Sequence, residues 1–256
     1  MNILTIIGAI FIGLSLGLLG SGGSIITVPL LIYVVGEPTK LAIAESLLIV
    51  GCISSFSSIG YIRRKLIDWP LVVLFGLPSM LGTYVGAWSS QFVLGIIQLI
   101  SFAAVMLIAS RFMLKPMVGH DPLSVQPPRT TLSIIGFGVG ALAGFVGVGG
   151  GFLIVPALHL LGKIPLHRAV GTSLVIIVMQ SISGFIKYQG VLASNDIFIN
   201  WSLVGVMILI GIAGAMAGVR LMDRLPQLTL KRIFAYLLIV LGSYMLVSSL
   251  YTHFTL

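Results

Sequence analysis

Apolar residues fill most of this chain in long runs that are separated by short polar segments. A helix that crosses a bilayer needs about 20 mostly apolar residues, so runs of this length predict membrane-spanning helices. The pattern therefore predicts an all-α integral membrane protein with about eight hydrophobic blocks. These blocks cover residues 3–34, 41–62, 69–88, 92–110, 131–161, 169–189, 201–219 and 233–252.

The second half of the chain repeats the first. A shift of 127 positions aligns the glycines, the valine and the proline of the first block with those of the fifth, for example Gly20 with Gly147. The following blocks keep the register, and after a five-residue insertion Trp69 aligns with Trp201. We interpret this as two homologous halves: a first transmembrane repeat at 1–115, a cytoplasmic linker at 116–129 and a second transmembrane repeat at 130–256.

The positions of the fourteen Lys and Arg residues predict how the chain crosses the membrane. If every block crosses once, the loops divide these residues seven against seven, which lacks the usual cytoplasmic excess. If the first and fifth blocks fold back, the division becomes twelve against two, with Lys40 and Lys187 outside. Both blocks are also too long for one ordinary span. We therefore expect inverted repeats with re-entrant or broken first helices.

Glycine-rich segments interrupt the first and fifth blocks and are the strongest candidates for a binding site. Irregular backbone is tolerated at membrane depth where protein buries it or where it lines a cavity. Half-helices in inverted repeats present N-terminal N–H groups that favour anions. We expect the two segments to meet near the midplane and bind a small anion. The predicted substrate-binding residues are Gly20, Ser21, Gly22, Gly23, Ser24, Gly147, Gly149, Gly150 and Gly151.

Other glycines have a simpler interpretation. Gly82 and Gly86 align with Gly214 and Gly218, and a spacing of four residues is typical of glycines that pack two helices closely. We interpret these four as packing residues. Packing is also the alternative for the two glycine-rich segments.

The blocks after the glycine segments carry repeated polar residues. Ser46 and Ser54 are eight residues apart and therefore lie on nearly one helix face, and Ser173 and Ser181 repeat this spacing. The predicted substrate site accordingly also includes Ser46, Thr172, Ser173 and Gln180. The alternative is that each serine bonds a carbonyl of its own helix.

Glu45 is the only acidic residue clearly inside a predicted span. An acid within the membrane is by default a functional hypothesis, and Glu45 is our candidate for proton coupling. The alternative is an interfacial position near the start of its helix, where water reaches the carboxylate.

Composition excludes several classes of function. The chain is 58% hydrophobic and 8% charged, against about 25% charged in soluble domains. The net charge of +8 resides in short loops, so it indicates topology and we expect no nucleic-acid partner. A single cysteine and four scattered histidines predict no metal site, and no cofactor is expected. The chain has no H-E-x-x-H, G-x-S-x-G or P-loop motif, so we expect neither an enzyme nor direct ATP drive.

The segments GLLGSGGSIITVPLL (17–31) and GFVGVGGGFLIVPAL (144–158), followed by AESL and GTSL, resemble the sulfite exporter TauE/SafE family, also called sulfonate uptake permeases. The resemblance spans nearly the whole chain. It implies an inner-membrane, multi-pass permease for sulfur-containing or other small organic anions. One departure is Glu45, which stands where such proteins often have threonine.

The sequence thus predicts a secondary transporter, either a permease or an exporter, of anions such as sulfite, sulfoacetate or sulfonates. It would work by alternating access around the glycine breaks, with proton coupling as an option. The expected partners are the small anionic substrate and the lipid bilayer, with a homodimer as a further option. The alternatives are a passive small-anion channel, a membrane enzyme or a membrane chaperone.

Overall fold

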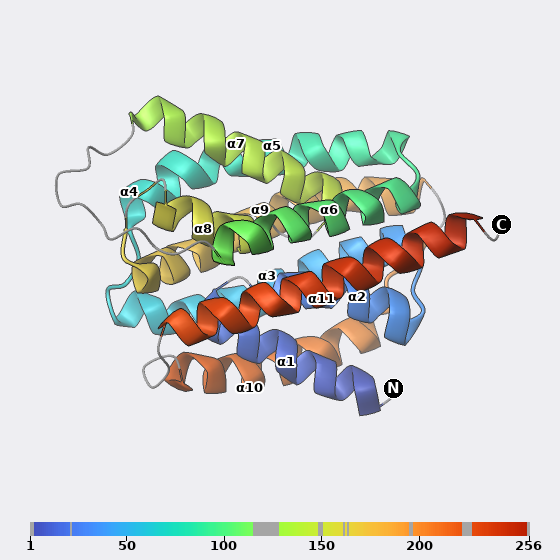
Figure 1. The fold of residues 1–256 in the computed structure, drawn as a ribbon, viewed down its shortest axis with the longest axis horizontal. Helices are drawn as coiled ribbons and strands as arrows, with labels where there is room; N and C mark the ends of the chain where they lie inside the picture. Colours follow the sequence, from blue (N-terminus) through green and yellow to red (C-terminus); the bar gives the residue numbers. More distant parts are fainter. Residues whose placement is uncertain are drawn as a thin grey trace.

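The computed structural model describes residues 3–20, 22–114, 128–147, 151–160, 162, 164–194, 197–221 and 227–254. The first half forms α1 (Ile3–Leu19), α2 (Gly22–Pro29), η1 (Leu30–Val35), α3 (Thr39–Arg63), α4 (Trp69–Leu71), η2 (Val72–Gly76), α5 (Leu77–Ser89), η3 (Ser90–Phe92) and α6 (Gly95–Leu114). The second half forms α7 (Arg129–Val146), α8 (Gly151–Leu160), α9 (Leu166–Ala193), α10 (Trp201–Leu221) and α11 (Gln227–Phe254). Figure 1 shows the resulting bundle.

The predicted all-α membrane class is confirmed. The described residues contain no strand. Among them, five helices are long and apolar enough to cross a membrane, and these are Thr39–Arg63, Trp69–Phe92, Arg129–Val146, His167–Ala193 and Trp201–Leu221. The predicted linker at 116–129 lies mostly outside the described residues, so the boundaries of the two repeats stay a prediction.

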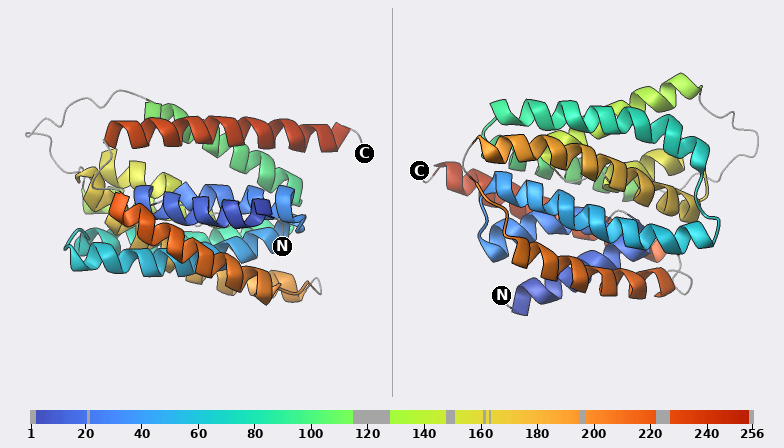
Figure 2. Two further views of the ribbon diagram at one scale, coloured as in Figure 1. Left: turned by 90° about the horizontal axis from the view of Figure 1, so that it is seen from below. Right: turned by 180° about the vertical axis from the view of Figure 1, so that it is seen from behind.

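The first helix of each half is broken where the sequence predicts. α1 ends at Leu19 before α2 begins at Gly22, and α7 ends at Val146 before α8 begins at Gly151. The first break reverses the chain, because Gly8 of α1 faces Leu30 of η1. α1 begins and α11 ends at the same end of the bundle (Figures 1 and 2). The inverted relation of the halves, and which end is cytoplasmic, stay predictions.

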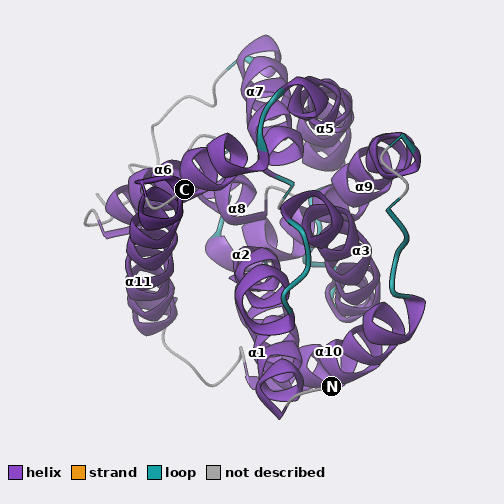
Figure 3. Ribbon diagram, turned by 90° about the vertical axis from the view of Figure 1, so that its right-hand side faces the viewer, coloured by secondary structure: helices purple, strands orange, loops and turns teal. Residues whose placement is uncertain are grey.

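Two long helices, α3 and α9, cross in the centre and are the most enclosed of the five spans. They are antiparallel: the side chain of Leu47 lies against Gly184, and Tyr61 lies against Gly171. Figure 3 shows α2 and α8 beside this pair, with α1 and α10, α5 and α7, and α6 and α11 around it.

The outer pairs join the two halves rather than separate them. α1 of the first half packs along α10 of the second, and α7 of the second packs along α5 of the first. α10 in turn contacts α3, and α5 contacts α9. The chain therefore forms two mixed units, α1–α3–α10 and α5–α7–α9, which meet where α3 crosses α9.

Glycines make these outer pairs possible. A Cβ atom at any of eight glycines would overlap a backbone carbonyl oxygen of the facing helix, so the two backbones are in direct contact. On α1 and α10 these are Gly13, Gly17, Gly214 and Gly218, and on α5 and α7 they are Gly82, Gly86, Gly140 and Gly144. All eight belong to the repeated set in the sequence. Close backbone approach through small residues is how helices associate in lipid, where the hydrophobic effect does not drive them together.

Two glycines of α10 test this packing role. A Cβ at Gly214 would lie 2.5 Å from the carbonyl oxygen of Ile10, whereas a Cβ at Gly205 meets nothing within 4 Å. We expect Gly214→Ala to lower the free energy of unfolding by about 1–3 kcal/mol, the usual cost of overpacking. Gly205→Ala should leave it unchanged or raise it by up to about 1 kcal/mol, since alanine favours helices. Thermal unfolding in detergent measures both, and equal effects would contradict the packing role.

Candidate functional site

The two helix breaks are built on glycines with left-handed backbone. Gly20 has a φ of +67° and Gly147 a φ of +78°, a region that residues with a Cβ rarely adopt. A Cβ at Gly20 would lie 2.7 Å from the carbonyl oxygen of Val170, and one at Gly147 would overlap the side chain of Ile43. Both the conformation and the close approach of the neighbouring helix therefore require glycine.

Each break is held by a serine from the other half of the chain. The Ser173 hydroxyl lies 3.1 Å from the carbonyl oxygen of Gly20, and the Ser46 hydroxyl lies 2.9 Å from that of Gly147. Each serine also lies 2.8 Å from a carbonyl of its own helix. A hydroxyl has one proton to donate, and here it is shared between two backbone acceptors. Both predicted substrate ligands thus fasten the breaks in this structure.

A tyrosine supports the helix just before each break. The Tyr61 hydroxyl donates to the carbonyl oxygen of Gly17 at 2.8 Å, and the Tyr188 hydroxyl lies 3.4 Å from that of Gly144. Both side chains are fully buried. They supply partners to carbonyls in the last turn, which the helix itself leaves unpaired. Sequence reasoning did not assign them a role, although the repeat aligns them.

The structure does not bring the two breaks into one site. Gly20 lies against Ser173, near the start of α9, while Gly147 lies against Ser46 on α3. The residue after Ser46 contacts Gly184, so Gly184 marks the level of Ser46 on α9. Gly184 lies eleven residues further along α9 than Ser173. At 1.5 Å per residue, the breaks are roughly 16 Å apart along the bundle. α2 and α8 are neighbours in the centre of the bundle (Figure 3).

The remaining glycine-segment residues are placed as follows. Gly22, Gly23 and Ser24 form the buried first turn of α2, and Gly151 begins α8 and is also buried. Ser21, Gly149 and Gly150 lie outside the described residues.

Glu45 and Thr172, which the repeat aligns, perform the same task in the two halves. The Glu45 carboxylate accepts a hydrogen bond from the backbone N–H of Asn200 at 3.0 Å, and the Thr172 hydroxyl accepts one from that of Asp68 at 3.0 Å. Asp68 and Asn200 in turn accept hydrogen bonds from backbone N–H groups in the first turns of α4 and α10. Glu45 of α3 thus fixes the residue that caps α10, and Thr172 of α9 fixes the residue that caps α4, so each central helix supports the start of a helix from the other half.

Protein atoms enclose the side chain of Glu45, which is 0% exposed. Its second oxygen, Oε2, has no hydrogen-bond partner among the described residues. The carboxylate is therefore a buried group with one structural bond and one free acceptor position. Both interpretations, proton coupling and an interfacial position near the start of α3, stay predictions.

In the described part of the chain, buried polar atoms without a partner lie on α3 and α9 near the point where these helices cross. The Ser54 hydroxyl, the Ser181 hydroxyl and the Gln180 side-chain oxygen are three of five buried side-chain atoms without a partner among the described residues. Ser181 faces Gly51, less than one turn from Ser54, because a Cβ at Gly51 would lie 2.8 Å from the Cβ of Ser181. An unpaired buried polar group costs about 1–3 kcal/mol, so such a cluster indicates a place for a polar ligand or water.

Gln180 connects this cluster to α5. Its amide nitrogen hydrogen-bonds the hydroxyl of Ser79, which is also fully buried. Because a hydroxyl can donate or accept, the amide can offer the cluster either its oxygen or its NH₂ group. Ser79 gave no signal in the sequence, since its counterpart in the second half is Gly211. We call Ser54, Ser181, Gln180 and Ser79 the central polar cluster.

Comparisons with known proteins agree with a transport role. The model of the family described as sulfite exporter TauE/SafE matches residues 5–245. A probable membrane transporter protein of Xylella fastidiosa (strain Temecula1) is 32% identical over 252 residues, which cover 95% of this chain and 94% of the relative. The probable membrane transporter protein YunE of Bacillus subtilis is 27% identical, with 92% of this chain and 93% of the relative covered. No solved structure gives a significant match.

A comparison of Gly147 with Gly36 distinguishes the two reasons why glycine is required at the breaks, which are the backbone conformation and the close approach of a neighbouring helix. Both have positive φ, but a Cβ at Gly36 meets nothing within 4 Å, whereas one at Gly147 overlaps Ile43. Gly36→Ala should cost only the conformational strain, about 1–2 kcal/mol. Gly147→Ala should cost about 1–3 kcal/mol more through overpacking. Apparent melting temperatures in detergent compare the two, and equal losses would show that the second break tolerates a side chain.

Proposed function

This chain belongs to the sulfite exporter TauE/SafE family and is a multi-pass membrane transporter, and we propose that it is a secondary transporter of small oxyanions. Sulfite, sulfoacetate and other sulfonates are the substrates that we favour. The family name and the chemistry of the central polar cluster support this choice.

The central polar cluster is the observation that carries the proposal. Its serine hydroxyls and glutamine amide are neutral hydrogen-bond donors, and the oxygens of a sulfite or sulfonate group accept such bonds. The cluster contains no cation, so it would hold an anion of low charge without binding it too tightly for release. It also lies at the crossing of α3 and α9, between the two mixed units.

The packing supports a specific form of alternating access. Transporters built from repeats expose a central site to each side in turn by rocking one bundle against the other. Here the rigid bodies would be the mixed units α1–α3–α10 and α5–α7–α9, since glycine-mediated backbone contacts join each of them. The α3–α9 crossing would then be the surface across which they move.

A ligand-stability screen tests the substrate. We expect sulfite or a sulfonate to raise the apparent melting temperature of the purified protein, because a ligand bound at 100 times its Kd adds about 2.7 kcal/mol. Sulfate, taurine and carboxylates are the comparison set. The double variant Ser54→Ala/Ser181→Ala should bind at least roughly tenfold more weakly, through loss of two hydrogen bonds to the anion.

Ser55→Ala is the matched control. The Ser55 hydroxyl lies beside Ser54 in sequence but donates to the carbonyl oxygen of Gly51 in its own helix at 2.8 Å. It should bind like the wild type. A folded double variant with wild-type affinity would place the site elsewhere. Anion flux into proteoliposomes that does not saturate would instead establish the passive channel.

Glu45→Gln tests proton coupling. Glutamine keeps a side-chain oxygen that can accept the Asn200 N–H bond but cannot carry the charge. We expect this variant to keep its melting temperature and its substrate exchange, and to lose uptake driven by a pH gradient. Glu45→Leu, which also removes the acceptor, should lose stability by about 1–3 kcal/mol. Unchanged gradient-driven uptake in Glu45→Gln would leave Glu45 with its structural bond alone.

A further inference from the structure

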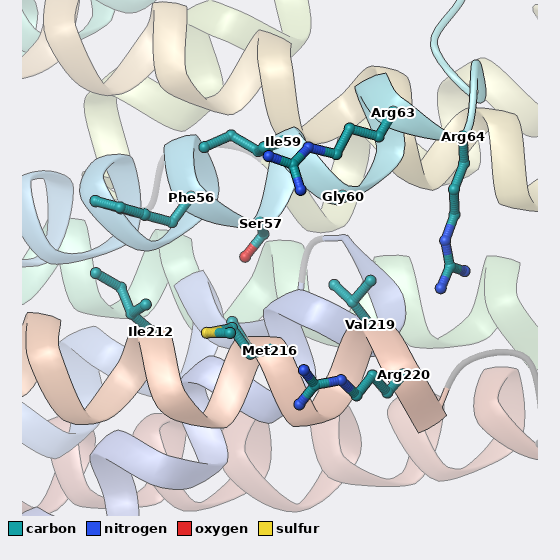
Figure 4. A pocket seen from close by; sticks show the side chains of 11 residues that line it. Phe56, Ser57, Ile59, Gly60, Arg63, Arg64, Ile212, Met216, Val219 and Arg220 are labelled. Carbon is teal, nitrogen blue, oxygen red and sulfur yellow. The ribbon is translucent and has the colours of Figure 1, made fainter.

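A groove of about 400 Å³ lies between the C-terminal halves of α3 and α10, outside the central polar cluster. Figure 4 shows Arg63 and Arg64 on the α3 side and Arg220 on the α10 side. The groove's described lining residues include these three arginines and no acidic residue. The proposed substrate site does not use any of them.

Each arginine alone has an ordinary explanation. Arg63 and Arg220 lie in the last turns of their helices, where a cation complements the helix dipole and can extend toward the membrane surface. Their convergence on one groove is not explained in this way. It concentrates positive charge at a single place on the bundle surface.

The walls of the groove below the arginines are apolar. On α3, Phe56 and Ile59 share a face with Arg63, because they precede it by seven and four residues. On α10, Met216 precedes Arg220 by four residues. Phe56, Ile59 and Met216 are 55%, 45% and 54% exposed, respectively. Seven residues of helix correspond to about 10 Å, so a strip of exposed apolar wall extends this far from the charged rim.

Gly60 sets how closely the two helices approach. A Cβ at Gly60 would lie 3.2 Å from a Val219 methyl group. The hydroxyl of Ser57 also lines the groove, but it donates to its own helix at the carbonyl oxygen of Ile53. The groove therefore offers an apolar channel with a cationic mouth.

We propose that this groove binds an anionic phospholipid. The phosphate would lie between Arg63 and Arg220, and an acyl chain would lie along Phe56, Ile59 and Met216. Basic pockets between membrane helices on the cytoplasmic side are typical sites for anionic headgroups, and the predicted topology puts this end of α3 and α10 on that side. A soluble anion would leave the exposed apolar wall without a partner, whereas a lipid satisfies both parts.

A bound lipid would bridge two helices from different halves of the chain, both within the unit α1–α3–α10. It would therefore stabilise that unit as one body. This inference rests on the groove alone and holds whichever substrate the protein carries.

The test uses the full-length protein purified in a neutral detergent, with phosphatidylglycerol and phosphatidylcholine as probes. Phosphatidylglycerol should raise the apparent melting temperature and remain bound in native mass spectrometry, and phosphatidylcholine should do neither. In the variant Arg63→Gln/Arg220→Gln, the apparent affinity for phosphatidylglycerol should fall roughly 30-fold, about fivefold for each arginine. Met216→Trp, which keeps all three charges but fills the apolar wall, should also weaken binding.

Arg111→Gln is the matched control, since Arg111 lies in the last turn of α6 and does not line the groove. It should bind phosphatidylglycerol like the wild type, and an equal loss in this control would overturn the proposal in favour of general surface charge. Inorganic phosphate is the second probe. If phosphate alone stabilises the protein as much as phosphatidylglycerol does, and Met216→Trp changes nothing, the groove is a site for a free anion and the lipid proposal is wrong.

Discussion

Backbone-to-backbone contact between helices of opposite halves is the constraint on which the rest of this structure depends. In a bilayer, apolar side chains gain little from leaving lipid for a protein neighbour, so tight contact has to come from surfaces that fit closely. The glycines along α1, α10, α5 and α7 provide such surfaces. They join each broken helix to a partner from the other half, and α3 and α9 cross in the centre between these two pairs.

The broken helices create a second requirement, which is met by polar side chains. Each break leaves backbone carbonyl oxygens without helical partners, and a membrane interior offers no water to donate hydrogen bonds to them. Ser173 and Ser46 reach the glycines at the breaks, and Tyr61 and Tyr188 reach the turn before them. All four residues therefore satisfy the irregular backbone, and the two serines also connect the halves, whereas each tyrosine bonds a carbonyl of its own half.

The sequence was sufficient to predict the elements that repeat. Overlong apolar blocks and in-register glycines predicted both breaks, and the structure has them at Gly20 and Gly147. The depth of each break could not be predicted, because it depends on how far α1 and α7 extend along their partners before they turn. The sequence therefore suggested one shared site, whereas the structure places the breaks at different levels.

The sequence also could not predict which distant residue a given side chain hydrogen-bonds. Glu45 is bonded to Asn200, which is 155 residues away, and no local pattern connects them. The repeat does contain the information in hindsight, because Thr172 and Asp68 form the equivalent bond. Ser79 could not be found at all, since a glycine occupies its counterpart position. Polar residues that occur in one half alone are the hardest to interpret from sequence.

Under the alternating access proposed above, those one-sided residues have a thermodynamic consequence. In a protein made of two identical inverted halves, a twofold rotation converts the inward-open form into the outward-open form, so the two have equal free energy. Each difference between paired positions removes that equality. Glu45 opposite Thr172, and Gln180 opposite Ile53, are such differences within the two central helices. A single kcal/mol between the forms shifts their ratio about fivefold, so a few unmatched side chains suffice to determine which way the empty protein faces at rest.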